Sequence, residues 1–216
     1  KIYLLNQDYA HGKQWAHYGR DMVGKARPDI QFVGETLHPM GRIKDFAPYV
    51  SKMKEVGADS AITGNWGQDL TLLLKSAGDA GYNLRYFNHS AGGFPGTVTA
   101  VSQAKIGQVT WVAEWHPGMA DRPQADARAK EYKAKMNQDF LAPRMDLVPR
   151  MLAAAIAKAQ STEPVKIAKA LEDMPMDTVF GPVKMRSKDH QLLLPQVVNT
   201  IAPVDGKVVK TGWEGT

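Results

Sequence analysis

The sequence predicts an α/β fold, with a parallel sheet and flanking helices in the first half and a more helical region after it. Short apolar runs recur at a steady interval up to Ala113, with helical patterns between them, and the alternation stops after Trp115. Because a parallel strand pair needs a long crossover, usually a helix, this spacing favours repeated βαβ units.

Five strands are expected in the first half. They begin about 28, 28, 26 and 23 residues apart and cover Ile2–Leu5, Ile30–Leu37, Ala58–Thr63, Leu84–Asn88 and Gly107–Ala113. The sequence opens directly on the first strand, with no Met and no signal peptide, so we expect any targeting segment to lie outside it.

Helices are expected between these strands. The first spans about residues 11–25. The second has Asp45 as its N-cap, Pro48 in its first turn and Gly57 as its C-terminal stop. The third ends at Gly81 and carries an apolar stripe of Leu70, Leu73, Leu74 and Ala77.

The pattern after Trp115 differs from this alternation. Helical periodicity covers residues 122–140 and 146–160, and a third helix is expected from a Thr162 cap to about Asp173. Short strands are expected at residues 183–185, 196–201 and 208–210. Three successive helices cannot continue the βαβ alternation, so we expect this region to form another layer or lobe.

Composition excludes several classes of protein. The chain has 44% hydrophobic residues and no Cys, which excludes disulfide scaffolds, thiolate zinc sites and cysteine nucleophiles. Its longest apolar stretches are far shorter than the roughly 18–20 residues that span a bilayer. The 27 Lys and Arg against 22 Asp and Glu are spread evenly, so no nucleic-acid partner is indicated.

Three loops should meet at one edge of the sheet, because each follows a strand of the same parallel sheet. Ligands of open parallel sheets bind at this edge, at the carboxyl ends of the strands. These loops are residues 6–9, 64–67 and 88–93. Tyr9 and Trp66 suit a ligand pocket, since each combines a flat apolar ring with a hydrogen-bonding group. The alternative is that either ring only packs over the sheet edge.

Enzyme and metal signatures are absent. The glycines of residues 92–96 lack the G-x-G-x-x-G order, and residues 64–67 lack the Lys-Ser/Thr ending of a phosphate loop. His89-Ser90 is not a nucleophile elbow. His11 and His17 are six residues apart and fall on different helix faces. We therefore expect no catalytic residues, no metal and no cofactor.

Three stretches carry a resemblance to a known family. They are KIYLLNQDYAHGKQWA at the start, DFAPYVSKMKEVGADSAITGNWGQDLTLLLKSAGDAG, and TVFGPVKMRSKDHQ near the end. Their order and spacing resemble the branched-chain amino-acid (Leu/Ile/Val-type) periplasmic substrate-binding proteins of ABC transporters. The resemblance runs from residue 1 to about 200. It implies a type I binding-protein fold, in which two α/β lobes close on a ligand.

The resemblance also implies a division of the chain. Residues 1–116 with 193–216 would form the second, Rossmann-like lobe, and residues 117–192 a helical segment of the first lobe. Trp115, His116 and Pro117 would form a hinge crossing. Members of the family have a further first-lobe segment ahead of the strand that Lys1 opens, so this chain resembles their C-terminal part only.

Ligand contacts follow from the same resemblance. Tyr9 matches a family tyrosine, Trp66 stands where amino-acid binders have tyrosine, and Ser90 falls where those proteins carry an acidic residue for the ligand's α-ammonium. Asn65, His89 and Ala91 complete the expected site. A buried ammonium without a countercharge costs several kcal/mol, so we expect an aromatic or carboxylate ligand more than an amino acid.

The resemblance implies a non-enzymatic, periplasmic solute receptor that delivers its ligand to the permease subunits of an ABC transporter. A ligand-sensing receptor or regulator of the same fold is the alternative. A nucleotide-using α/β enzyme is a third possibility, which the failed glycine motifs disfavour.

Overall fold

The computed structural model describes residues 1–89, 91, 94–104, 108–115, 119, 121–138, 140, 144–201, 203–204 and 207–208. The chain divides into two compact units, unit 1 (Lys1–Val112 and Val198–Thr216) and unit 2 (Ala113–Val197). The sequence-based boundaries lie a few residues away, at 116/117 and 192/193. The correspondence of these two units to the two lobes of the family stays a prediction.

Unit 1 is built on a six-stranded sheet with the order β2-β1-β3-β4-β5-β9. The pairings among the first five strands are parallel, as predicted. The strands are β1 (Ile2–Gln7), β2 (Phe32–His38), β3 (Ser60–Ile62), β4 (Arg85–Phe87), β5 (Gln108–Ala113) and β9 (Val197–Ile201). Each of β1 to β5 begins within two residues of its predicted start.

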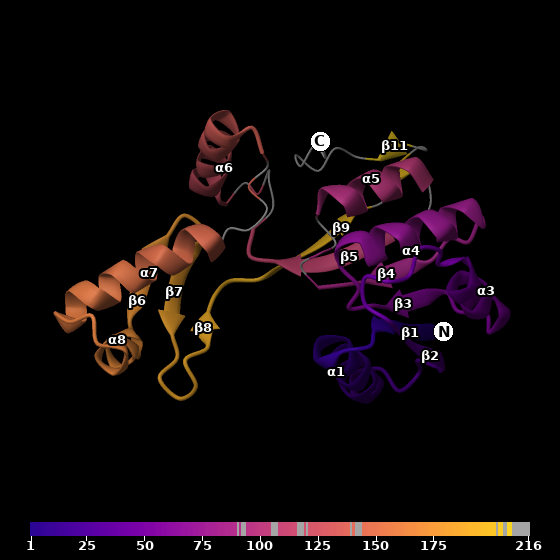
Figure 1. Ribbon diagram of the computed structural model, residues 1–216, viewed down its shortest axis with the longest axis horizontal. Helices are drawn as coiled ribbons and strands as arrows, with labels where there is room; N and C mark the ends of the chain where they lie inside the picture. Colours follow the sequence, from indigo (N-terminus) through magenta and orange to yellow (C-terminus); the bar gives the residue numbers. More distant parts are fainter. Residues whose placement is uncertain are drawn as a thin grey trace. The chain divides into compact units, whose positions relative to one another are not determined.

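Helices lie on both faces of this sheet (Figure 1). One face carries α3 (Ala47–Glu55), α4 (Gly67–Asp79) and α5 (Pro95–Ala104). The other carries α1 (Ala10–Tyr18), which continues into the π-helical turn η1 (Gly19–Val23) and the short α2 (Gly24–Ala26). Residues 11–25 were predicted as one helix, and they are helical throughout but change their hydrogen-bond pattern at Gly19.

Helix α5 has no counterpart among the predicted helices. Its sequence, PGTVTAVSQA, is poor in strong helix formers. The packing of α5 on α4 stabilises it, because the two helices approach closely: a Cβ atom on Gly78 would lie 2.5 Å from the Cβ atom of Ala104. Tertiary contact thus overrides weak local propensity here.

Unit 2 combines three helices with a small sheet. The helices are α6 (Pro123–Met136), α7 (Arg144–Ala159) and α8 (Pro164–Leu171). The sheet has the antiparallel order β6-β7-β8, with β6 (Pro175–Thr178), β7 (Gly181–Met185) and β8 (Leu192–Leu193). The apolar faces of α7 and α8 pack on β7, with Leu147, Met151, Ala155, Ala170, Met174 and Val183 as the core.

Several details differ from the predictions. Asp45 was predicted to cap α3, but Phe46 is the N-cap, and the Asp45 carboxylate accepts from the backbone N–H of Ala47. Thr162 was predicted to cap α8, but Glu163 is the N-cap, and its carboxylate accepts hydrogen bonds from the backbone N–H groups of Val165 and Lys166. Strands β6 and β8 were not predicted. The strand expected at residues 208–210 extends beyond the described residues, and only β10 (Pro203–Val204) and β11 (Lys207–Val208) are placed there.

Candidate functional site

Two aromatic side chains meet at the carboxyl edge of the sheet. Tyr9 and Trp66 are the extended residues that precede α1 and α4, and therefore follow β1 and β3. The Trp66 indole N–H donates to the Tyr9 hydroxyl at 2.9 Å, across 57 residues of sequence. Trp66 keeps 42% of its surface exposed. This pair offers a flat apolar surface that is anchored at one end and open to a ligand.

Three further rings extend this surface. The ring centroids of Tyr9 and His11 lie 5.7 Å apart, those of His11 and His89 4.8 Å, and those of His89 and Trp15 5.7 Å. We call Tyr9, His11, Trp15, Trp66 and His89 the aromatic wall. It joins the loop after β1, the first turns of α1 and the loops after β3 and β4.

Both imidazoles of the aromatic wall favour the uncharged form. Burial lowers the pKa of His89 to about 4; the hydrogen bond to the Gly64 carbonyl opposes this effect and the nearby His11 adds to it. Burial also lowers the pKa of His11. The wall therefore presents neutral rings and hydrogen-bonding groups at neutral pH.

A layer of buried amides holds the loop that carries Trp66. Asn6 accepts a hydrogen bond from the backbone N–H of Gly64 at 2.6 Å. Asn88 donates to the carbonyls of Thr63 and Asn65 at 2.7 and 2.8 Å. All three side chains of this layer, Asn6, Asn65 and Asn88, are buried. Because these bonds tie β1, β3 and β4 together, they hold the backbone of the loop that carries Trp66.

Asp69 is a buried carboxylate at the same edge. It lies in the first turn of α4 and is 2% exposed. One carboxylate oxygen accepts from the Gln7 amide at 2.6 Å and from the backbone N–H of Gly41 at 2.9 Å. Asp69 therefore fastens the loop after β2 to β1 and α4, and the N-terminal end of α4 favours its negative charge.

The structure separates the predicted site residues into two groups. Tyr9, Trp66 and His89 belong to the aromatic wall. Asn65 and Ala91 are fully buried: the Asn65 amide bonds to His38, and the Ala91 carbonyl accepts from Thr97. Asn65 and Ala91 thus hold the loops after β3 and β4 through buried hydrogen bonds. Ser90 lies outside the described residues.

The predicted hinge is described only in part. Trp115 is buried and lies beside the rings of Phe140 and Phe180 within unit 2, whereas His116 and Pro117 lie outside the described residues. The acidic residue next to Trp115, Glu114, is also buried, and Arg144 of α7 donates to it. Its charge is therefore already paired within unit 2.

Sequence reasoning missed three residues of this edge. His11 and Trp15 are four residues apart on α1, so they share a helix face, and this spacing could have linked them to Tyr9. Asp69 follows Trp66 by three residues, within the first turn of α4. Its burial depends on Gln7 and Gly41, which no local pattern reveals.

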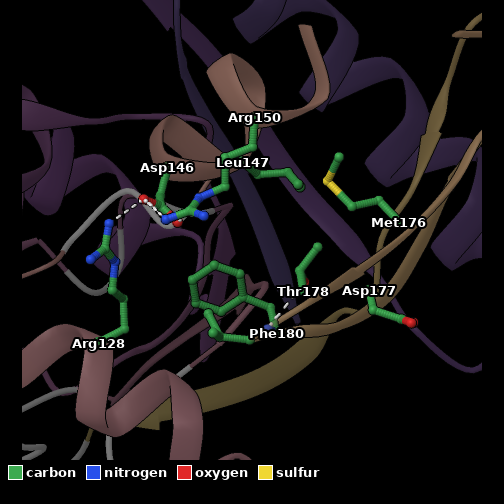
Figure 2. Close-up of a pocket in the computed structure, with 9 residues that line it drawn as sticks. Arg128, Asp146, Leu147, Arg150, Met176, Asp177, Thr178 and Phe180 are labelled. Carbon is green, nitrogen blue, oxygen red and sulfur yellow. Dashed lines mark hydrogen bonds and ion pairs between the residues drawn. The ribbon is translucent and has the colours of Figure 1, made fainter. Parts of the chain in front are cut away.

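A separate pocket of about 160 Å³ lies in unit 2 (Figure 2). Arg128 and Arg150 both donate to Asp146 on its wall, and Leu147 and Phe180 lie beside them. Burial raises the pKa of Asp146, but the hydrogen bonds from the two arginines outweigh this effect and lower it. Arg128 and Arg150 are both paired with Asp146, so we assign this pocket no ligand.

In the part of the chain that the structure describes, no three His, Cys, Asp or Glu side chains lie close enough together to hold a metal ion. In that same part, no helix is long and apolar enough to cross a membrane.

The sequence and the fold match known proteins. A family model described as "Periplasmic binding protein" matches residues 1–201. The Leu/Ile/Val-binding protein homolog 4 of Brucella abortus is 28% identical over 94% of this chain and 49% of its own length. A leucine-, isoleucine-, valine-, threonine- and alanine-binding protein of Pseudomonas aeruginosa is 28% identical over 79% of this chain and 46% of its own length.

Solved structures agree. The leucine-, isoleucine-, valine-, threonine- and alanine-binding protein of Brucella ovis, in a closed conformation, has a TM-score of 0.76 and 26% identity, covering 100% of this chain and 58% of that one. A type 1 periplasmic binding protein of Bordetella pertussis has a TM-score of 0.81 and 18% identity, covering 96% and 60%.

The chain spans about half the length of the curated relatives it matches. The match nevertheless covers nearly all of the chain and includes every strand of the six-stranded sheet. This chain belongs to the periplasmic binding protein family and has its type I fold.

Proposed function

We propose that the full-length protein is the periplasmic solute-binding component of an ABC transporter. It captures a small organic ligand between two closing lobes and delivers it to the permease, without catalysis. The relatives named above support this role, because two of them are named for the amino acids they bind. Unit 1 supplies the second-lobe wall of the site.

The hydrogen-bonded pair of Tyr9 and Trp66 carries this proposal. Two loops distant in sequence place their rings together, and buried amides hold the loop of Trp66. Ligand sites in proteins combine apolar and aromatic surface with a few fixed polar groups. Tyr9, Trp66 and His89 contact the ligand in this proposal, and Asn65 and Ala91 position the loops that carry them.

The ligand is an aromatic or other carboxylate without an α-ammonium group. The described residues of the aromatic wall include no carboxylate, and the neighbouring Asp69 is only 2% exposed, with one of its oxygens bonded to Gln7 and Gly41. An enclosed ammonium group would therefore lack a countercharge on this side. A protein of this fold can bind such an acid: a solute-binding protein of Rhodopseudomonas palustris is in complex with 3,4-dihydroxybenzoic acid (TM-score 0.79, 16% identity).

Calorimetric titration of the full-length protein with leucine and with benzoate tests the ligand class. We expect benzoate to bind more tightly than leucine, isoleucine or valine. The variant Ser90→Glu should move the preference toward the amino acids, because it restores an acidic residue at the position where the amino-acid binders carry one. Submicromolar binding of leucine by the unmodified protein would overturn the assignment.

A further inference from the structure

Two histidines lie side by side in the aromatic wall. His11 belongs to the first turn of α1, and His89 belongs to the loop after β4. Their ring centroids are 4.8 Å apart and their planes are perpendicular. Both rings lie beside Trp15, and His11 also lies beside Tyr9. Two groups that can each take up a proton therefore share one apolar surface at the carboxyl edge of the sheet.

The two imidazoles differ in what holds their nitrogens. The Nε2 atom of His89 lies 3.1 Å from the Gly64 carbonyl oxygen, an acceptor, so this nitrogen carries the proton of the neutral ring. The Nε2 atom of His11 is buried and has no hydrogen-bond partner among the described residues. The His11 ring as a whole is only half-buried, and it lines an open groove beside α1. His11 can therefore gain a proton without breaking a hydrogen bond of the described structure.

The charged groups around this pair already have partners. The titratable groups nearest to the pair in sequence or space are Asp8, Tyr9, Lys13, Tyr18 and Asp69. Asp8 and Lys13 form an ion pair of 2.9 Å at the surface, and the buried Asp69 carboxylate accepts two hydrogen bonds. Burial lowers the pKa of both imidazoles, and among the described residues the one charge that contributes is that of His11, which acts on His89. The described carboxylates thus do not hold a proton on His11.

We propose that His11 takes up a proton from solvent when a carboxylate ligand is enclosed, so that the protein captures the anion and the proton together. This inference rests on the proposed function, because it needs a ligand with a negative charge and no ammonium group. A carboxylate that is removed from water needs a countercharge close to it. The described residues of the aromatic wall include no permanent cation, and an imidazole is the group that becomes one near neutral pH.

Proton uptake also makes the site selective for charge. A nearby carboxylate favours the protonated form of His11, a neutral ligand of the same shape does not, and an ammonium group opposes it. Because the complex with a carboxylate binds more protons than the free protein, the affinity for that ligand must increase as the pH falls toward the range in which His11 titrates. Benzoate and benzamide have the same shape and differ in charge, so they form a matched pair of probes.

Calorimetry of the full-length protein with benzoate measures this uptake directly. At pH 6.5 the binding enthalpy is compared in PIPES and in imidazole buffer, and its dependence on the ionisation enthalpy of the buffer gives the number of protons taken up. We expect at least about 0.3 proton per benzoate, and an affinity about 3-fold to 10-fold higher at pH 6 than at pH 8, a range in which benzoate stays ionised. Benzamide should bind without proton uptake.

Two variants assign the proton to a residue. His11→Gln should abolish both the uptake and the pH dependence of benzoate affinity. His17→Gln is the matched control, because His17 is an exposed histidine of the same helix outside the aromatic wall, and this variant should keep both effects. Urea unfolding checks that both variants are folded, and the comparison of benzoate with benzamide needs no variant.

Three results would overturn the proposal. They are benzoate binding without proton uptake, equal uptake with benzamide, and uptake that persists in His11→Gln. The first of these leaves the proposed ligand class intact, because benzoate still binds. A full-length protein that does not bind benzoate contradicts the ligand class and this proposal together, so the two failures can be told apart.

Discussion

The two units differ in where they keep their polar side chains. Of the ten buried polar or charged residues among those described, nine lie in unit 1 and only Glu114 lies in unit 2. Unit 2 instead places its charges in ion pairs nearer the surface, such as Arg186 with Asp189. Buried polar groups lower stability unless they are hydrogen-bonded, so their concentration in unit 1 indicates a structural demand at one place.

That place is the carboxyl edge of the sheet. Asn6 and Gln7 end β1, Thr63 follows β3, and Asn88 follows β4. Their hydrogen bonds hold the loops of the aromatic wall, whereas the surface ion pairs of unit 2 hold no comparable loop. Unit 1 is therefore organised around its carboxyl edge, and unit 2 around the apolar contacts of α7 and α8.

Replacing Asp69 by Ala should have the largest effect on stability. The change leaves the buried amide of Gln7 and the backbone N–H of Gly41 without their acceptor, so we expect a loss of about 3–4 kcal/mol in the free energy of unfolding. Asp146→Ala in unit 2 is the matched control. Asp146 also pairs with two partners but is 18% exposed, so its loss should be about 1 kcal/mol. Urea unfolding that gives equal losses would contradict the comparison.

Acid should destabilise unit 1 through His89. Burial lowers the pKa of His89 in the folded state to about 4, below the ordinary value of 6.5, so the unfolded chain binds more protons between these values. Above pH 6.5 His89 is neutral in both states and does not lower the free energy of unfolding. As the pH falls from 6.5 toward 4, the free energy of unfolding should decrease by about 2–3 kcal/mol in total. Urea unfolding at pH 7.5 and pH 4.5 should show this loss, and His89→Gln should reduce it. An unchanged pH dependence in His89→Gln would contradict the assignment.

Gly12→Ala should disturb the start of α1. A Cβ atom at Gly12 would lie 1.9 Å from the carbonyl oxygen of Gln7, so the helix must shift away from β1, at a cost of about 1–3 kcal/mol. Gly19→Ala is the matched control, since its Cβ atom would meet only side-chain atoms, those of Ile62 at 3.3 Å and Leu4 at 3.7 Å. Thermal unfolding distinguishes the two variants. A Gly12→Ala protein as stable as Gly19→Ala would show that β1 and α1 are packed less closely than described.

Tyr9→Phe should have the smallest effect on stability. The phenol is partly exposed, and its bond to the Trp66 indole is an exposed one, so we expect a change within about 0.5 kcal/mol. Ligand binding should nevertheless weaken, because Trp66 loses the group that anchors its ring. A large loss of stability in urea unfolding would mean that the aromatic wall serves the core and not a ligand.

The sequence-based analysis located the sheet well because the strands of unit 1 are apolar and evenly spaced. It missed α5, whose residues favour other conformations and which forms through its contact with α4 at Gly78. It placed the cap of α8 one residue early, because Thr162 is the more usual capping residue while Glu163 reaches the same N–H groups.

The candidate site was only partly predictable for a similar reason. Tyr9, Trp66 and His89 follow strands and could be placed at one edge from topology alone. The burial of Asn65 and Asp69 depends on partners from β1 and from the loop after β2, namely Gln7, His38 and Gly41. Such long-range hydrogen bonds leave no periodic signal in the sequence.

Titration of Trp66→Ala in the full-length protein tests the central claim, that the edge of unit 1 binds the ligand. With benzoate as the probe, we expect the affinity to fall by about 2–4 kcal/mol, or roughly 30-fold to 1,000-fold, while urea unfolding changes little because the ring is 42% exposed. Lys75→Ala is the control: Lys75 is exposed on α4, the helix that follows Trp66, and its replacement should leave benzoate binding unchanged. Unaltered benzoate affinity in Trp66→Ala, or no benzoate binding by the unmodified protein, would contradict the account.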